Sequence, residues 1–129
     1  MVENTRRALR FPFLATAEIA PENMPSATIS ATVKELSLHG CFLESPSPFR
    51  AHTDVLVKIF VESEYFEAKA TVLYVSPTLG MGLAFRRVNP AFAAVLQKWL
   101  LSAMQEKQES LIDSRGVKRG QLADAEQFS

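Results

Sequence analysis

Apolar and polar residues alternate with a period of two along much of the chain. In the segment 27–37, Ile29, Ala31 and Val33 fall on one face of an extended chain, and the residues between them are polar. The segment 54–61 repeats this alternation. A two-residue period is typical of half-buried β-strands, so the pattern predicts a chain built mainly from strands.

Turn-forming residues divide this region into six predicted strands. The Ser-Pro-Ser-Pro segment 45–48 predicts a loop, because two prolines in four residues cannot sustain a hydrogen-bonded ladder. A tight connection at 38–40 and a turn at Ser63-Glu64 separate further strands. The connections are too short for crossover helices, so the strands should be antiparallel, and six of them suffice to close a small barrel. The predicted strands are 14–20, 27–37, 41–44, 54–61, 65–75 and 81–85.

A helix is predicted after the last strand. Asn89 suits the N-cap, and Pro90 suits the first helical position, where its missing N–H costs nothing. The apolar residues that follow recur at helical spacing, so one face of the helix should pack on the barrel. These residues are Phe92, Leu96, Trp99 or Leu100, and Ala103.

The predicted fold class is all-β with a C-terminal helix, as a six-stranded antiparallel β-barrel. Barrel and helix together are expected to occupy residues 14–112, preceded by an arginine-bearing segment, 1–13. Residues 113–129 are expected to form a mobile tail, because Gly116, Gly120 and mixed charge accompany little apolar content there.

Composition narrows the functional classes. Fourteen Lys and Arg balance fourteen Asp and Glu, so no net charge draws the chain to DNA, RNA or anionic lipid. The single cysteine, Cys41, cannot form an intrachain disulfide and suits a reducing compartment. No run approaches the roughly 18 consecutive apolar residues of a membrane span, and the N-terminus lacks a clean secretory cleavage site. We therefore expect a cytoplasmic protein that does not insert into membranes.

The local concentration of charge lies near the N-terminus, where Arg6, Arg7 and Arg10 share the first ten residues with one acid, Glu3. Guanidinium groups form forked hydrogen bonds with phosphate oxygens and stack on flat rings. The three arginines are thus a candidate anion site, and the alternative is a solvated basic arm.

A second candidate is the segment 35–40, Glu-Leu-Ser-Leu-His-Gly. Glu35 and Ser37 are two residues apart, so they share one face at the end of a strand, and Gly40 leaves room for a close approach to the backbone. The structural alternative is a bulged hairpin in which the Ser37 hydroxyl satisfies its own turn.

The cysteine, the histidines and the phenylalanines are expected to have structural roles and no catalytic, metal-binding or base-stacking role. His39 and Cys41 are close in sequence, but no third group orients them, so we expect no catalytic residue and no enzyme. His39 and His52 lack a recognisable metal-ligand spacing, and no metal or cofactor is expected. Five phenylalanines that could stack on bases are expected in the core, because no basic residues are interleaved with them. They are Phe13, Phe42, Phe60, Phe66 and Phe85.

Taken together, the two polar candidates resemble the PilZ domain family. That family carries R-x-x-x-R before its first strand and [D/N]-x-S-x-x-G between its second and third strands. Arg6 and Arg10 match the first motif, and Glu35, Ser37 and Gly40 occupy the second, with Glu in place of Asp or Asn. The segment 80–85 and the helix after it resemble the end of such domains.

The resemblance implies a β-barrel that binds cyclic di-GMP, a bacterial second messenger, and signals to a downstream protein partner. Arg6 and Arg10 would contact phosphates and the O6 and N7 acceptors of guanine, and Arg7 would be available for stacking or as a substitute. Glu35 and Ser37 would accept from the opposite guanine edge, and Gly40 would allow close approach. The alternative is a PilZ-like protein-interaction module that binds no nucleotide.

Overall fold

The computed structural model describes residues 10–77 and 79–115, and for 107–115 it describes the backbone alone. The described residues form six strands, one short 3-10 turn and one long helix. In chain order they are β1 (Phe11–Pro21), η1 (Pro25–Ala27), β2 (Ile29–Leu36), β3 (Gly40–Glu44), β4 (Asp54–Val61), β5 (Glu64–Ser76), β6 (Gly80–Arg87) and α2 (Pro90–Arg115).

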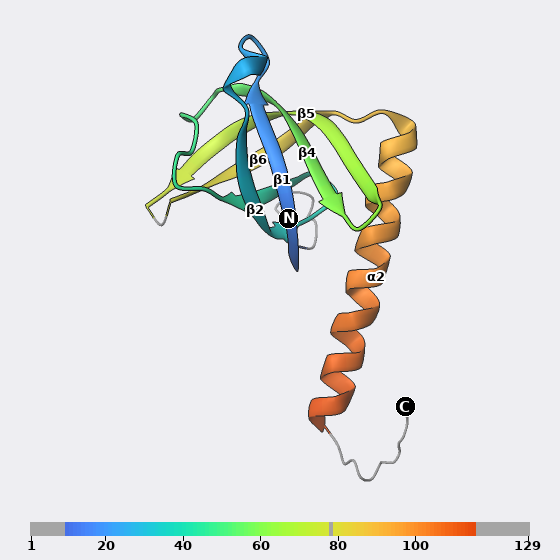
Figure 1. The fold of residues 1–129 in the computed structure, drawn as a ribbon. Helices are drawn as coiled ribbons and strands as arrows, with labels where there is room; N and C mark the ends of the chain where they lie inside the picture. The colour runs from blue at the N-terminus through green and yellow to red at the C-terminus, as the bar shows by residue number, and fades with distance from the viewer. Residues whose placement is uncertain (1–9, 78, 116–129) are drawn as a thin grey trace, which may run out of the picture.

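The six strands close into an antiparallel barrel in the order β1-β2-β3-β6-β5-β4, with β4 pairing back onto β1 (Figure 1). This confirms the fold predicted from the sequence. Closure removes the free strand edges that an open sheet would expose. The consecutive strands β3 and β4 do not pair with each other, and β6 lies between β3 and β5.

The inward-facing positions of the strands supply the core, as the period of two requires. Val55, Val57 and Ile59 on β4 are fully buried, and the residues between them are more exposed. Ala31 and Val33 on β2 follow the same alternation. The hydrophobic core therefore fills the barrel interior, and the alternate residues of each strand form the outer face.

The first strand begins earlier than predicted, at Phe11 and not at residue 14. Phe11 pairs with Leu36 and Pro12 pairs with Glu35. Pairing of β1 with β4 begins only at Thr16, so the missing N–H of Pro12 removes no bond on that side of the strand. The strand therefore accommodates a proline near its start and places Arg10 directly beside β2.

The other strand boundaries lie within two residues of the prediction, and those of β4 match it. The β4–β5 turn is Glu62-Ser63 and not Ser63-Glu64. Glu62 takes a left-handed backbone conformation with φ 55°, which a tight hairpin turn requires. The shift frees Glu64 to begin β5.

Helix α2 starts as the sequence predicts. The Asn89 side-chain oxygen accepts a hydrogen bond of 2.9 Å from the backbone N–H of Ala91, and Pro90 opens the helix. The predicted apolar face, including Leu96 and Ala103, is buried against the barrel.

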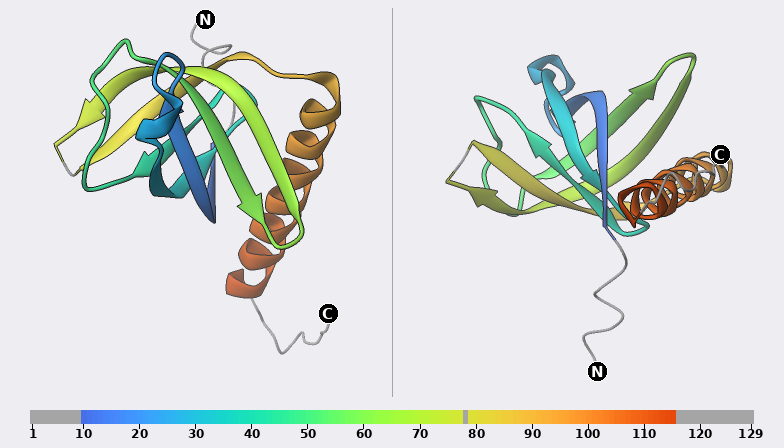
Figure 2. Two further views of the ribbon diagram at one scale, coloured as in Figure 1. Left: turned by 45° about the horizontal axis from the view of Figure 1, so that its top comes forward. Right: turned by 90° about the horizontal axis from the view of Figure 1, so that it is seen from below.

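The helix lies beside the β4–β5 hairpin, and its C-terminal half projects past the barrel (Figures 1 and 2). It continues to Arg115, beyond the predicted end at residue 112, and residues 116–129 of the expected tail lie outside the described residues. No helix in the described part of the chain is long and apolar enough to cross a membrane.

Aromatic rings join the helix to the barrel. Phe66 on β5 is fully buried, and its ring contacts those of Phe85, Phe92 and Trp99, with centroids 5.1 to 6.4 Å apart. Phe13 stacks on the Trp99 ring at 5.7 Å. Phe13, Phe66 and Phe85 thus lie in or against the core, as predicted.

A polar clamp at Glu64 reinforces this contact. The Glu64 carboxylate accepts hydrogen bonds from the Lys98 ammonium and from the Trp99 indole N–H, the latter 3.1 Å long. These bonds, that of Lys98 first, lower the pKa of Glu64 below its ordinary value of 4.5. The clamp therefore stabilises the docked helix whenever the carboxylate is ionised.

We expect Glu64→Gln to lower Tm by a few degrees at pH 7. A carboxyl with a depressed folded-state pKa stabilises the fold above its unfolded pKa, and this contribution is lost as the pH falls through the folded pKa. The Tm difference between the parent and the variant should therefore shrink below pH 4.5. Thermal melts from pH 7 to pH 3 measure it, with Glu62→Gln in the adjacent turn as the control. A difference that stays constant over this range would contradict the clamp.

Candidate functional site

A groove of about 510 Å³ lies on the outer surface of the barrel, over β2, β3, β6 and β5. We call it the outer groove. Four of the six site residues predicted from the sequence line it, together with two aromatic side chains and part of β6. The predicted residues are Arg10, Glu35, Ser37 and Gly40, and the aromatic residues are Phe42 and Tyr74.

Arg10 and Glu35 form an ion pair at one end of the outer groove. Arg10 Nη1 lies 3.5 Å from Glu35 Oε1, and the two side chains are 63% and 46% exposed. The pairing of Pro12 with Glu35 brings the two residues together, since Arg10 directly precedes β1. A cation with forked donors and an acceptor carboxylate thus face the same open space.

Ser37 is buried within the β2–β3 turn. Its backbone N–H donates to the Gly40 carbonyl at 2.9 Å, and its hydroxyl donates to the same oxygen at 3.2 Å. The hydroxyl also accepts a bond of 3.2 Å from the His39 backbone N–H. The Ser37 hydroxyl therefore bonds within its own turn, which is the structural alternative stated in the sequence analysis, and it stabilises that turn.

Gly40 permits close packing of two strands. A Cβ atom built on Gly40 would lie 2.0 Å from the Leu83 carbonyl oxygen, so any side chain would force β3 away from β6. The close approach that the sequence predicted at Gly40 is thus made by the backbone of β6. Ser37 and Gly40 together fix the floor of the outer groove beside Glu35.

Arg6 and Arg7, the other two predicted site residues, lie outside the described residues. Arg10, which follows them in the sequence, lies at the end of the groove that Glu35 occupies.

Cys41 and His39 do not form a reactive pair. Cys41 is buried, and desolvation raises the pKa of its thiol to about 12. The thiol is therefore protonated at neutral pH, whereas nucleophilic chemistry needs the thiolate. His39 is exposed at the turn, and its carbonyl accepts a bond from the Phe85 N–H. Within the described residues, no three His, Cys, Asp or Glu side chains are placed to hold a metal ion.

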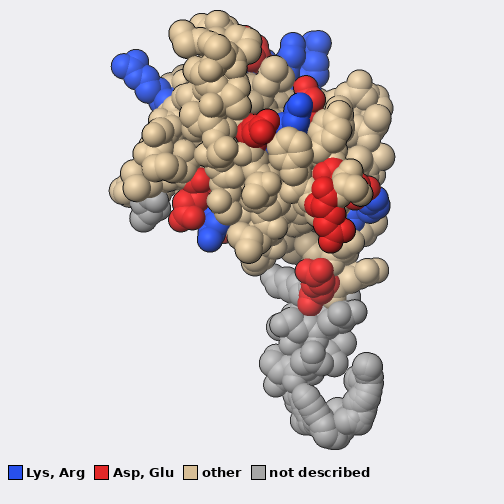
Figure 3. Space-filling model, in the orientation of Figure 1, with Lys and Arg blue, Asp and Glu red and all other residues tan. Residues whose placement is uncertain are grey.

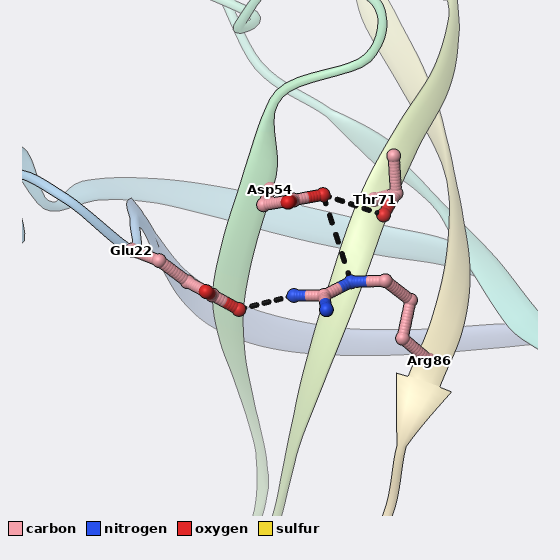
Figure 4. A network of polar contacts seen from close by, with 4 residues as sticks. All are labelled: Glu22, Asp54, Thr71 and Arg86. Atoms are coloured by element: carbon pink, nitrogen blue, oxygen red, sulfur yellow. Dashed lines mark hydrogen bonds and ion pairs between the residues drawn. The ribbon is translucent and has the colours of Figure 1, made fainter.

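A second polar cluster lies elsewhere on the barrel surface (Figure 4). The Arg86 guanidinium donates to the Glu22 carboxylate, and its Nε lies 3.6 Å from Asp54 Oδ1. Thr71 donates to the same Asp54 oxygen at 2.8 Å. These groups satisfy one another and link β4, β5 and β6 to the loop after β1, so the cluster has a structural role.

The charged side chains visible in Figure 3 are interspersed, with Lys and Arg next to Asp and Glu. This face carries no continuous basic strip of the kind that nucleic acid binding needs. The picture agrees with the balanced charge of the sequence.

The sequence analysis missed the aromatic wall of the groove. Phe42 was predicted to be a core residue, but it points outward from β3 and lines the outer groove, so that prediction is wrong. Tyr74 was not singled out. The available signal was the pair Gly80 and Gly82 on β6, whose missing side chains leave room for the two rings.

Comparison with known proteins identifies relatives of this chain. The family model described as PilZ domain matches residues 4–102. A search of curated proteins finds no match.

Several solved structures share the fold. The PilZ domain of CeSA from a cellulose-synthesizing bacterium is 14% identical with a TM-score of 0.60, and the match covers 74% of this chain and 97% of that one. The PilZ domain of YcgR from Escherichia coli with c-di-GMP is 16% identical with a TM-score of 0.66, covering 82% and 96%. YcgR in complex with c-di-GMP is 18% identical with a TM-score of 0.70, covering 85% of this chain and 50% of that one. The chain thus spans about half of that longer protein.

Proposed function

Because the chain belongs to the PilZ domain family, we propose that it is a receptor for cyclic di-GMP and binds the dinucleotide in the outer groove. The observation that carries the proposal is the placement of Arg10 beside Glu35 in this groove. The support from relatives is that PilZ domain structures with c-di-GMP share the fold.

The chemistry of the two side chains fits the ligand. A guanidinium group forms a fork onto the O6 and N7 atoms of guanine or onto phosphate oxygens. A carboxylate accepts hydrogen bonds, so Glu35 suits the N1–H and N2–H edge of a guanine base. Arg6 and Arg7 would supply further cations from the segment before Arg10.

The ion pair between Arg10 and Glu35 does not prevent this role. Ion pairs between exposed side chains contribute only about 0 to 1 kcal/mol, so a ligand that offers each group a better partner can replace it. Ser37 and Gly40 would act by shaping the turn beside Glu35, because the Ser37 hydroxyl already bonds within the turn.

The wider role follows from this assignment. We propose that the protein is not an enzyme and acts in the bacterial cytoplasm, without DNA, RNA or membrane insertion. Ligand binding would alter the position of the arginine segment next to Arg10, and a downstream protein would recognise that change. The competing function is a PilZ-like interaction module that binds no nucleotide, which is favoured by Glu35 standing where the family has Asp or Asn.

Calorimetric titration of the protein with cyclic di-GMP decides between these functions. We expect saturable binding, and 5′-GMP should bind far more weakly because it offers one base and one phosphate. If cyclic di-GMP produces no binding signal and leaves Tm unchanged, the receptor function is wrong and the interaction module replaces it.

Substituting Glu35 by Asp is expected to tighten cyclic di-GMP binding several-fold. The longer glutamate carboxylate must adopt an unfavourable rotamer or push the base outward, and an off-rotamer χ costs about 0.5 to 1.5 kcal/mol. Aspartate also reaches less far toward Arg10, which frees both groups for the ligand. Calorimetry on the two proteins measures the change.

Glu35→Ala is the matched control, and it should weaken binding because the guanine donors are left unpaired. Should Glu35→Asp bind more weakly than the parent, the longer side chain is an adaptation of this site, and the argument from the family motif fails at this position.

A further inference from the structure

Two aromatic rings of the outer groove lie over β6. Phe42 comes from β3 and Tyr74 from β5, the two strands that flank β6. A Cβ atom built on Gly80 would lie 2.2 Å from the tip of the Phe42 ring, and one built on Gly82 would lie 2.3 Å from the Tyr74 ring. Each ring therefore covers one glycine directly.

The two rings are close neighbours with nearly parallel planes. Gly80 and Gly82 are two residues apart on one strand, which separates them by roughly 6.6 Å. The ring centroids are 6.3 Å apart, nearly the same spacing, and the ring planes are within 24° of parallel. Because Phe42 and Tyr74 also line the outer groove, both rings offer part of their surface to a ligand there.

A β-bulge aims the β5 residues into the groove. Val72 pairs with Leu83 and Tyr74 pairs with Gly82, so the register shifts between them and Leu73 is the extra residue. Val72 is buried, whereas Leu73 and Tyr74 are 54% and 44% exposed and both line the groove. Bulges are common next to functional sites, where they re-aim side chains.

The rings and the charged pair belong to one surface. Glu35 pairs with Phe42, Phe42 with Gly82, and Gly82 with Tyr74, so these residues form a single row across β2, β3, β6 and β5. Adjacent strands are about 4.8 Å apart, which places Tyr74 roughly 14 Å from Glu35. A ligand with two bases joined through phosphates can extend along such a row.

We propose that Phe42, Tyr74 and Leu73, which we call the aromatic platform, stack on one purine base of the bound dinucleotide. The proposal rests on the proposed function and adds a second base contact to it. Flat aromatic faces bind the faces of nucleobases whatever their hydrogen-bonding edges. The platform thus takes one base by its face while Arg10 and Glu35 contact the charged and polar atoms of the ligand at the other end.

The test compares Tyr74→Leu, Tyr74→Phe and the parent in calorimetric titrations with cyclic di-GMP. Tyr74→Leu keeps an apolar cover over Gly82 but removes the ring, so Kd should rise at least about fivefold, equivalent to about 1 kcal/mol. Tyr74→Phe keeps the ring and should bind within about twofold of the parent.

Tyr65→Leu is the matched control. Tyr65 lies on the same strand and is 43% exposed against 44% for Tyr74, but it does not line the outer groove. Its substitution should leave Kd unchanged. If the parent binds and Tyr74→Leu binds equally well, the platform is wrong and the receptor function stands. If the parent does not bind, both are wrong.

A readout on the unaltered protein does not depend on how any variant folds. The chain has two tyrosines, so ring-labelled tyrosine gives two sets of NMR signals. Saturation with cyclic di-GMP should shift the Tyr74 signals through the ring current of the base and leave those of Tyr65 in place. Unshifted Tyr74 signals in the saturated protein would overturn the platform.

Discussion

Arg10→Ala is expected to weaken cyclic di-GMP binding at least tenfold while leaving Tm close to that of the parent. A forked contact from a guanidinium to guanine contributes about 1 to 3 kcal/mol of binding, and alanine offers no substitute. The stability of the fold should be unchanged, because the Arg10 side chain is 63% exposed and its ion pair with Glu35 is a surface contact.

Two further variants test whether the loss of binding comes from the forked guanidinium group of Arg10. Arg10→Lys keeps the charge but loses the planar fork, so it should recover only part of the affinity. Arg50→Ala removes an exposed arginine that does not line the outer groove, so binding should be unaffected. Parent-like binding by both Arg10→Ala and Arg6→Ala would show that the dinucleotide binds elsewhere.

The barrel could be predicted from the sequence because its strands are half buried. Alternation in the segment 27–37 specifies which residues face the core, and that pattern fixes the strand and its orientation together. The pattern says less at strand ends, where only one neighbour pairs. The first strand was predicted to start at residue 14, but β1 extends through Pro12, where it has a β2 partner and no β4 partner.

The site was less accessible to sequence reasoning than the fold. Arg10 and Glu35 were found because charge stands out near a strand end, and the structure brings them together. Phe42 was misassigned because a phenylalanine in a strand is usually a core residue. Its true position depends on glycines some forty residues later in the chain, and no local pattern reveals which ring will cover them.

The roles of Ser37 and Gly40 in the β2–β3 turn could not be assigned from the sequence, for a different reason. The spacing of Ser37 and Gly40 suggested either ligand contact or turn formation, and local sequence could not separate the two. The contacts of the structure show that both residues shape the β2–β3 turn, with Ser37 bonded to Gly40 and Gly40 packed on Leu83. Their contribution to binding would therefore be indirect, through the position of Glu35.

Gly40→Ala tests whether Gly40 has this structural role. The substitution should destabilise the fold by about 2 to 4 kcal/mol, which is a Tm decrease of roughly 10 °C. The new Cβ would meet the Leu83 carbonyl oxygen at 2.0 Å, and because that oxygen belongs to the backbone, β3 and β6 must separate. Thermal and urea melts measure the loss.

Gly82→Ala provides the comparison, because the atoms nearest its Cβ all belong to the Tyr74 side chain, which can rotate away. Its Tm should therefore fall less than that of Gly40→Ala, although its displaced ring should weaken nucleotide binding. Arg10→Ala would then lose binding with the fold intact, and Gly40→Ala would lose it together with stability. A Gly40→Ala protein that melts like the parent would mean that β3 can shift at little cost, and the role of Gly40 would have to be sought in contact with the ligand.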